Sequence, residues 1–160
     1  MKLSACVACG LVLLGGRASF AKQPAPGKSK NPDVLQFRLV EDKEGPDTVA
    51  MKLKGKDETL HVNKQVLLNA LDVESARATH DAVRGTPNIS LNFTRDGAKK
   101  FAEVTAKNVN RKLAIIVDGQ LLSAPIIRTA IEGGKAIIEG DFKLKEAQEL
   151  VHAINGSAAE

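Results

Sequence analysis

The chain has 160 residues, 43% of them hydrophobic and 26% charged, which is typical of one globular domain and excludes a mainly disordered or membrane-embedded protein. Aromatic residues make up only 3%, without tryptophan or tyrosine, so the sequence lacks the stacking platforms of carbohydrate-binding and base-stacking surfaces. The formal net charge of +4 falls to +2 without residues 1–21, which contain Lys2, Arg17 and no acidic residue, and so small a charge does not indicate nucleic acid as a partner.

Residues 1–21 have the pattern of a secretory signal peptide. Lys2 precedes an uncharged apolar run, Leu3–Gly16, and Ser19-Phe20-Ala21 has small residues at the two positions that signal peptidase reads. We expect cleavage after Ala21, and hence a periplasmic or secreted protein without an integral membrane segment. A buried N-terminal helix and a membrane anchor are the alternatives, but this apolar run is short for a bilayer span.

Both cysteines, Cys6 and Cys9, lie in this segment, so the cleaved chain has no disulfide, no thiolate metal site and no cysteine nucleophile. Leu3-Ser4-Ala5-Cys6 resembles a lipoprotein cleavage site. A lipid anchor at Cys6 is therefore a minor alternative to cleavage after Ala21. Residues 22–33 are rich in proline and lysine, which predicts a flexible linker. We expect a single domain over residues 34–156.

Short antiparallel strands, with water on one face, are predicted in the first part of this domain. Val34–Val40 and Thr48–Leu53 alternate apolar with polar residues. Gly55-Lys56-Asp57 predicts a turn into a further strand at Thr59–Val62.

The middle of the chain is less regular. Val66–Val73 fits either a helix or a brief strand, and both interpretations stay open. Ser75–Gly85 is polar, and no strand is predicted there. Thr86-Pro87 then favours an extended entry into a strand at Ile89–Phe93.

Two amphipathic helices are predicted in the second half. Thr94 has the hydroxyl of a good N-cap, and apolar residues recur at helical spacing over Ala98–Val109. The second helix covers Leu144–Ile154. We expect Asp141 to cap its start and Asn155-Gly156 to end it.

The stretch between these helices predicts a sheet. Asp118-Gly119 readily adopts positive φ, so it joins Leu113–Val117 to Gln120–Ala124 in a tight hairpin. Gly133-Gly134 is expected to form the same kind of turn before Ala136–Glu139. The fold class is therefore α+β, an antiparallel sheet with two amphipathic helices packed on one face.

The sequence indicates neither a catalytic site nor a metal or cofactor site. His61, His80 and His152 are far apart and do not have the spacing of metal ligands. A relay of His80 with Asp81 and a serine is conceivable, but adjacent residues do not easily orient one another. We therefore predict that the protein is not an enzyme, and a small hydrolase is the least favoured alternative.

Several motifs between residues 66 and 155 follow one another in a particular order. They are the strand and helix start Ile89–Phe101, Lys112–Gly119, Leu122-Ser-Ala-Pro-Ile126, Ile131-Glu-Gly-Gly134, Ile138-Glu-Gly140 and Glu146-Ala147. As an ordered set they resemble the head of the first periplasmic domain of the SecD/SecDF protein-export membrane proteins. One departure is Lys143, because the last helix of that family usually opens with Thr or Ser.

A second departure concerns the end of the chain. SecD-type proteins continue into transmembrane helices that use the proton gradient, whereas this sequence ends at Glu160. We therefore expect that this chain alone does not couple proton flow to movement.

The resemblance implies a non-enzymatic role in protein export, in which the domain captures translocating polypeptide. Unfolded or translocating polypeptide and envelope export proteins are the expected partners, and reuse of the domain with an unrelated envelope partner is the alternative. An unfolded chain can add itself to an exposed sheet edge through main-chain hydrogen bonds. The candidate polypeptide-binding residues are Asp118, Gly119, Leu121, Leu122, Ile126 and Ile127. Alternatively, these leucines and isoleucines simply pack under the helices.

Overall fold

The computed structural model describes residues 30–81 and 85–156, so the predicted signal peptide and most of the predicted linker lie outside the described residues. The last residues of that linker contact the domain. Pro32–Val34 form a 3-10 helix, η1, and Lys30 Nζ donates hydrogen bonds to the carbonyl oxygens of Val73 at 2.6 Å and Glu74 at 3.0 Å.

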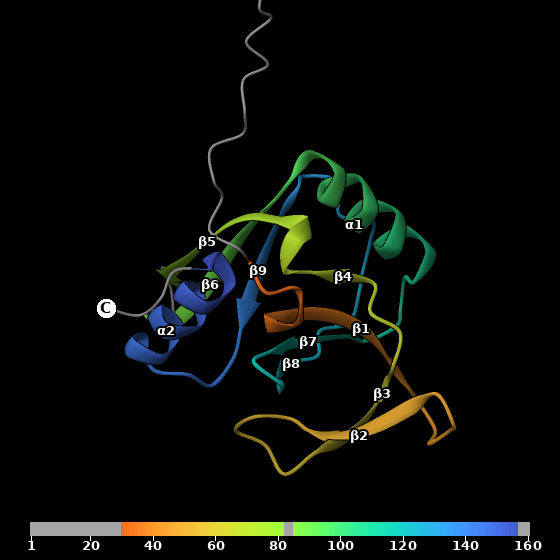
Figure 1. Ribbon diagram of the computed structural model, residues 1–160. Helices are drawn as coiled ribbons and strands as arrows, with labels where there is room; N and C mark the ends of the chain where they lie inside the picture. Colours follow the sequence, from red (N-terminus) through yellow and green to blue (C-terminus); the bar gives the residue numbers. More distant parts are fainter. Residues whose placement is uncertain (1–29, 82–84, 157–160) are drawn as a thin grey trace, which may run out of the picture.

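The strands form two antiparallel sheets (Figure 1). The larger sheet has the spatial order β2 (Thr48–Lys52), β3 (Thr59–Asn63), β1 (Leu35–Glu41), β7 (Leu113–Val117) and β8 (Gln120–Ser123), with β4 (Leu68–Asn69) paired to β1. The smaller sheet has the order β5 (Val73–His80), β6 (Pro87–Phe93) and β9 (Lys135–Glu139). The helices are η2 (Ala70–Asp72), α1 (Arg95–Lys107) and α2 (Leu144–Asn155). The predicted α+β class is confirmed, but the strands are divided between two sheets.

β7 is the strand around which both hydrophobic cores form. Side chains alternate across a strand, so Leu113, Ile115 and Val117 enter the larger core, whereas Ala114 and Ile116 enter the smaller one. All five residues are buried. The uninterrupted apolar run in the sequence therefore reflects a strand that is covered on both faces.

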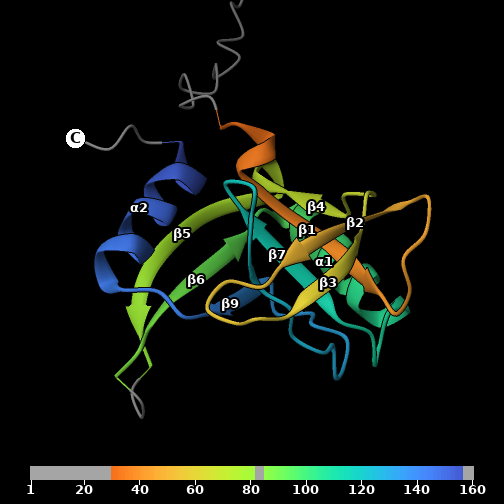
Figure 2. The ribbon, with the colours of Figure 1, turned by 90° about the horizontal axis from the view of Figure 1, so that it is seen from below.

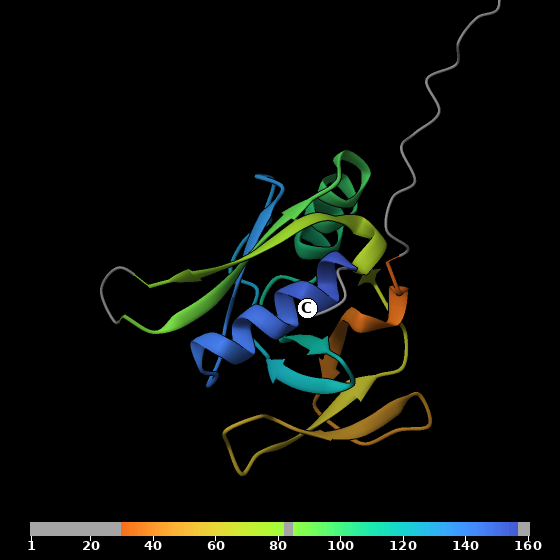
Figure 3. The same cartoon turned by 60° about the vertical axis from the view of Figure 1, so that its left-hand side comes forward.

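The larger core lies between the two sheets. The rings of Phe93 and Phe101 stack with centroids 4.6 Å apart, and the ring of Phe37 lies 5.9 and 5.8 Å from them. Ala147 and Ile154 of α2 are fully buried in the same core. Both helices therefore pack on the core-facing side of β5 and β6, as predicted. Figure 3 shows the smaller sheet on the side of the molecule away from β2 and β3.

The smaller core lies under the hairpin of β2 and β3, which crosses over β1 and β7 (Figure 2). Its buried members are Leu53, Leu60, Val62, Ala114, Ile116 and Leu121. The chain just after β2 returns to β8, because Leu53 pairs with Leu121 and the backbone N–H of Lys54 donates to the Leu121 carbonyl oxygen at 2.9 Å.

One of the two predicted N-caps is correct. Thr94 Oγ1 accepts a hydrogen bond at 3.0 Å from a backbone N–H in the first turn of α1. The prediction that Asp141 caps α2 is wrong. The N-cap is Lys143, which makes no side-chain cap bond, and Asp141 lies against Gly55, where an added Cβ would come within 2.7 Å of its carboxylate. Gly156, with φ of 71°, ends α2 as predicted.

The prediction of no strand in the polar stretch Ser75–Gly85 is wrong, because this stretch contains most of β5. The β5 residues that face the core include the small side chains of Ala76 and Ala78, and the register shifts between Val73 and Ser75. A bulge of this kind breaks the alternation by which a half-buried strand is usually found.

The expectation that Gly133-Gly134 forms a hairpin turn is also wrong. β9 pairs with β6, whereas the segment before it contacts other elements. Ile127 N donates to the Arg111 carbonyl oxygen at 2.9 Å, and Ile131 N donates to Thr105 Oγ1 at 2.9 Å. Val66–Val73, for which two interpretations were open, contains β4 followed by η2.

Candidate functional site

The predicted Asp118-Gly119 turn is present and exposed. Asp118 has φ of 49° and Gly119 has φ of 74°, the left-handed values that a two-residue hairpin turn needs. The turn lies beside two adjacent hollows of about 520 and 550 Å³, which share Gly119 and two residues of β2, Val49 and Met51. This part of the candidate surface is accessible to a partner.

Leu121 and Leu122 of β8 are buried, with 1% and 2% of their surface exposed. They point to opposite sides of the strand, Leu121 into the smaller core and Leu122 into the larger one. On the side of β8 away from β7, the main-chain carbonyl oxygen of Leu121 already accepts a hydrogen bond from Lys54 N. These two residues therefore pack inside the domain.

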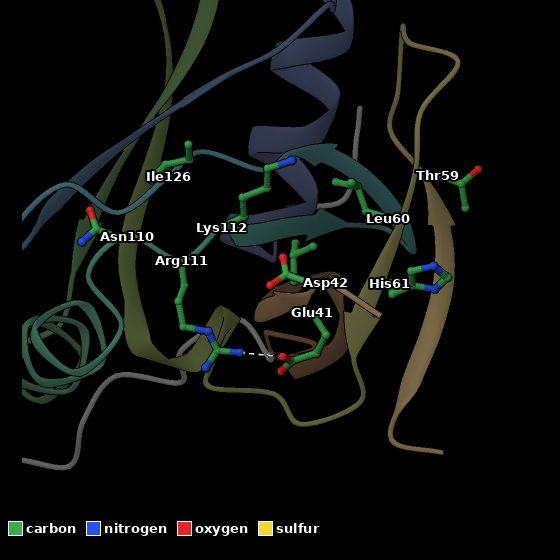
Figure 4. Close-up of a pocket in the computed structure, with 10 residues that line it drawn as sticks. Glu41, Asp42, Thr59, Leu60, His61, Asn110, Arg111, Lys112 and Ile126 are labelled. Atoms are coloured by element: carbon green, nitrogen blue, oxygen red, sulfur yellow. Dashed lines mark hydrogen bonds and ion pairs between the residues drawn. The ribbon is translucent and has the colours of Figure 1, made fainter. Parts of the chain in front are cut away.

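Ile126 and Ile127 differ in their exposure. Ile127 is 4% exposed and belongs to the larger core. Ile126 is 42% exposed and lines a pocket of about 490 Å³ (Figure 4). Of the six candidate residues, Asp118, Gly119 and Ile126 are thus on the surface.

The pocket beside Ile126 contains an ion pair between two residues that are far apart in the sequence. Arg111 Nη2 lies 2.7 Å from Glu41 Oε2, and Asn63 Nδ2 donates to Glu41 Oε1 at 3.1 Å. The hydrogen bond from Asn63, followed by the hydrogen bond and charge of Arg111, holds the pKa of Glu41 below its ordinary value, although burial acts in the opposite direction. The pair joins the end of β1 to the chain just before β7.

The residues that line the pocket come from separate parts of the chain. Figure 4 shows Thr59, Leu60 and His61 along β3 on one side, and Asn110 and Ile126 on the other. Within the part of the chain that the structure describes, the buried Nδ1 of His61 has no hydrogen-bond partner.

The other polar residues considered for catalysis are also separate. His80 and His152 are exposed, and Ser75 Oγ accepts a hydrogen bond from Asn92 Nδ2 at 3.2 Å. Over residues 30–81 and 85–156, no group of three metal-ligating side chains is found. Neither α1 nor α2 of the described chain is long and apolar enough to span a membrane.

The outer edge of β9 is a feature that the sequence analysis missed. Phe93 N donates to the Gly134 carbonyl oxygen at 2.9 Å, which fixes the alternation of hydrogen-bonded pairs between β6 and β9. Ala136 and Ile138 therefore bond to β6. The residues that direct their backbone N–H and C=O away from β6 are Lys135, Ile137 and Glu139. No described residue forms a hydrogen bond with these backbone groups.

The side chains along this edge are exposed. Ile138 is fully buried, whereas its neighbour Ile137 has 59% of its surface exposed, the largest fraction among the large hydrophobic residues described. Lys135 and Glu139 are exposed on the same face as Ile137. β9 thus combines free main-chain groups with an apolar side chain in the centre of the strand.

A hollow of about 580 Å³ connects this edge to the candidate surface after β8. It is lined by Glu139 at the end of β9 and by Ala124, Pro125 and Ile126, among others. The exposed Ile126 therefore lies where a chain that follows β9 past Glu139 would continue.

Residues 47–159 match the protein family described as SecDF, P1 head subdomain. The protein translocase subunit SecDF of Thermus thermophilus is 40% identical over 131 residues, which cover 73% of this chain and 18% of the relative. The protein translocase subunit SecD of Acidaminococcus fermentans is 36% identical over 126 residues, covering 77% of this chain and 29% of the relative. The chain therefore spans less than a third of the length of these curated relatives.

The fold agrees with this result. The solved structure described as "Structure and function of a membrane component SecDF that enhances protein export" matches with a TM-score of 0.62 and 35% identity. The match covers 78% of this chain and 62% of that chain. The relatives are thus components of a protein translocase.

Proposed function

Because this chain belongs to the SecDF P1 head subdomain family, we propose that it acts in protein export by binding translocating polypeptide without catalysis. The sequence from 1 to 21, with its signal-peptide pattern, supports a location in the periplasm or outside the cell. There the domain would bind polypeptide and catalyse no reaction.

The open edge of β9 is the observation that carries this proposal. An extended polypeptide can pair with Lys135, Ile137 and Glu139 through main-chain N–H and C=O groups, which every polypeptide has. Binding of this kind does not depend on the sequence of the bound segment. It therefore suits a domain whose partners are many unfolded proteins.

Side-chain contacts would add buried apolar surface to the main-chain hydrogen bonds. Ile137 lies beside the added strand, and Ile126 lines the hollow that begins at Glu139. A bound segment that extends past Glu139 would place an apolar side chain against Ile126. Asp118 and Gly119 lie on a separate exposed surface. Each contact is small, so we expect weak binding that is quickly reversed, as transfer of a moving polypeptide requires.

Site-specific photo-crosslinking tests the proposal. A photoreactive residue is placed at position 137 or, as the control, at Leu71 of η2, which has nearly the same exposure, 57% against 59%. We expect an unfolded secretory protein to crosslink strongly to position 137 and weakly to position 71, and the same protein after folding to crosslink to neither.

Three results would contradict the proposal. Equal crosslinking at positions 137 and 71 would show that β9 has no special role. Capture no greater than that of an unrelated soluble protein would show that the domain does not bind unfolded chains. Crosslinking of position 137 to a folded envelope protein alone would instead favour reuse of the domain with an unrelated partner.

A further inference from the structure

The free edge of β9 is complementary to itself. The strand reads Lys135-Ala-Ile-Ile-Glu139, with a cation at its first position, an anion at its last and Ile137 in the centre. When two such strands run in opposite directions about Ile137, each Lys135 lies opposite Glu139 of the second copy. Each Ile137 then lies opposite the same residue of the other copy.

The hydrogen-bonding groups fit the same arrangement. In an antiparallel ladder, residues that direct their main-chain groups toward each other form the hydrogen-bonded pairs. Lys135, Ile137 and Glu139 are the residues of β9 that point away from β6, and they are also the residues that the two-fold arrangement places opposite one another. A shift of two residues in either direction would instead put Ile137 opposite a charged side chain.

From this match we propose that two copies of the chain associate through β9, antiparallel about Ile137. The two smaller sheets then form one continuous sheet of six strands, and the two-fold axis passes between the central isoleucines. Opposite charges directly across an antiparallel pair stabilise it, and like charges destabilise it. The charge pattern of β9 therefore selects this register.

The dimer also has a consequence for polypeptide binding, and this part rests on the proposed function. A second copy uses the same N–H and C=O groups that an extended polypeptide would use. Self-association and polypeptide binding therefore exclude each other. The dimer is a resting form whose free edges are covered, which also protects them from indiscriminate aggregation.

Sedimentation equilibrium of the full chain over about 1 μM to 1 mM, the range in which interfaces this small associate, tests the dimer. A reducing buffer prevents crosslinks through Cys6 and Cys9. We expect a weak wild-type dimer and a dissociation constant raised about tenfold or more in Lys135→Glu and in Glu139→Lys, because each change creates two like-charge pairs. The double variant K135E/E139K restores the opposite pairs and should return to within about threefold of wild type.

A control exchanges a similar pair elsewhere. Lys145 and Glu149 of α2 have the same spacing in the sequence and are exposed, so K145E/E149K should leave the dissociation constant unchanged. A wild-type chain that stays monomeric, single variants that dimerise like wild type, or a double variant without recovery would each overturn the dimer.

The dimer and the proposed function can fail separately. A monomeric chain that still crosslinks unfolded polypeptide at position 137 refutes the dimer and keeps the proposed function. The opposite result is a chain that dimerises with the expected charge dependence but crosslinks no polypeptide, even when diluted below the dissociation constant of the dimer. This result keeps the dimer and refutes the proposed function.

Discussion

The side-chain amide of Asn155 makes both outward-facing backbone hydrogen bonds of Ala76. Its Oδ1 accepts from Ala76 N at 2.8 Å, and its Nδ2 donates to the Ala76 carbonyl oxygen at 2.9 Å. The last residue of α2 thus takes the place of a neighbouring strand at this point of β5. At Ala76, the β5 edge of the smaller sheet is therefore covered by a side chain of α2, whereas no described residue bonds to the outer main-chain groups of β9.

Replacement of Asn155 by alanine should lower the free energy of unfolding by about 1–3 kcal/mol, because it leaves two main-chain groups of Ala76 without partners. Urea unfolding measures this loss. Glu149→Ala, at an exposed position of the same helix, is the control and should change stability by less than about 0.5 kcal/mol. Equal effects of the two substitutions would show that the amide does not hold the β5 edge.

Gly97→Ala should be strongly destabilising. A Cβ at Gly97 would lie 2.1 Å from the carbonyl oxygen of Asp72, which also accepts a hydrogen bond from Thr94 N at 2.8 Å. Neither backbone can move without disturbing the start of α1, so we expect a loss of about 2–4 kcal/mol in thermal or urea unfolding. Gly133→Ala is the matched control, since nothing lies within 4 Å of its added Cβ. A stable Gly97→Ala chain would contradict this packing.

Glu41 should make stability depend on pH. Its pKa is lowered in the folded chain from an ordinary value of 4.5 by Asn63 and then by Arg111, so the unfolded chain binds a proton more readily. The stabilisation is therefore complete above pH 4.5 and is lost as pH falls through the lower folded-state pKa. Near neutral pH, Glu41→Gln should cost about 0.5–1 kcal/mol, and the difference from wild type should shrink under acid.

Urea unfolding of both chains from pH 3 to pH 7 measures this difference. Glu103→Gln is the control, because Glu103 lies 3.9 Å from Lys107 in a more exposed pair on α1. A difference between Glu41→Gln and wild type that stays constant with pH would contradict the role assigned to Asn63 and Arg111.

The sequence predicts well those elements whose signals are local. The Asp118-Gly119 hairpin follows from two residues that tolerate positive φ, and α1 follows from Thr94 and the helical spacing behind it. The family resemblance also rests on local motifs of this kind. These signals depend on neighbours in the chain and do not require knowledge of which strands pair.

The remaining features depend on contacts between distant residues. Asp141 was expected to cap α2 by its position in the sequence, but its side chain lies against Gly55 of a distant turn. Leu121 and Ile126 are both apolar residues near one hairpin, yet one is 1% exposed and the other 42%. The free edge of β9 could not be predicted from the sequence. It exists because β9 pairs with β6 on one side and with no other described strand.

Ile137→Lys should weaken the capture of unfolded polypeptide while the fold is retained. The side chain is 59% exposed, so a charged residue is tolerated there, but lysine on a free edge opposes the addition of a strand. We expect at least a roughly fivefold loss of binding, measured by fluorescence anisotropy with a labelled unfolded secretory protein. Leu71→Lys, at a site of nearly equal exposure outside the sheets, should bind like wild type.

Amide hydrogen exchange along β9 tests the central claim most directly. In the free, dilute chain, the amides of Ala136 and Ile138 should be protected by their bonds to β6, whereas those of Lys135, Ile137 and Glu139 should exchange quickly. Addition of an unfolded secretory protein should slow exchange at these three amides. If binding occurs and exchange at Lys135, Ile137 and Glu139 stays unchanged, polypeptide does not pair with the β9 edge and the account is contradicted.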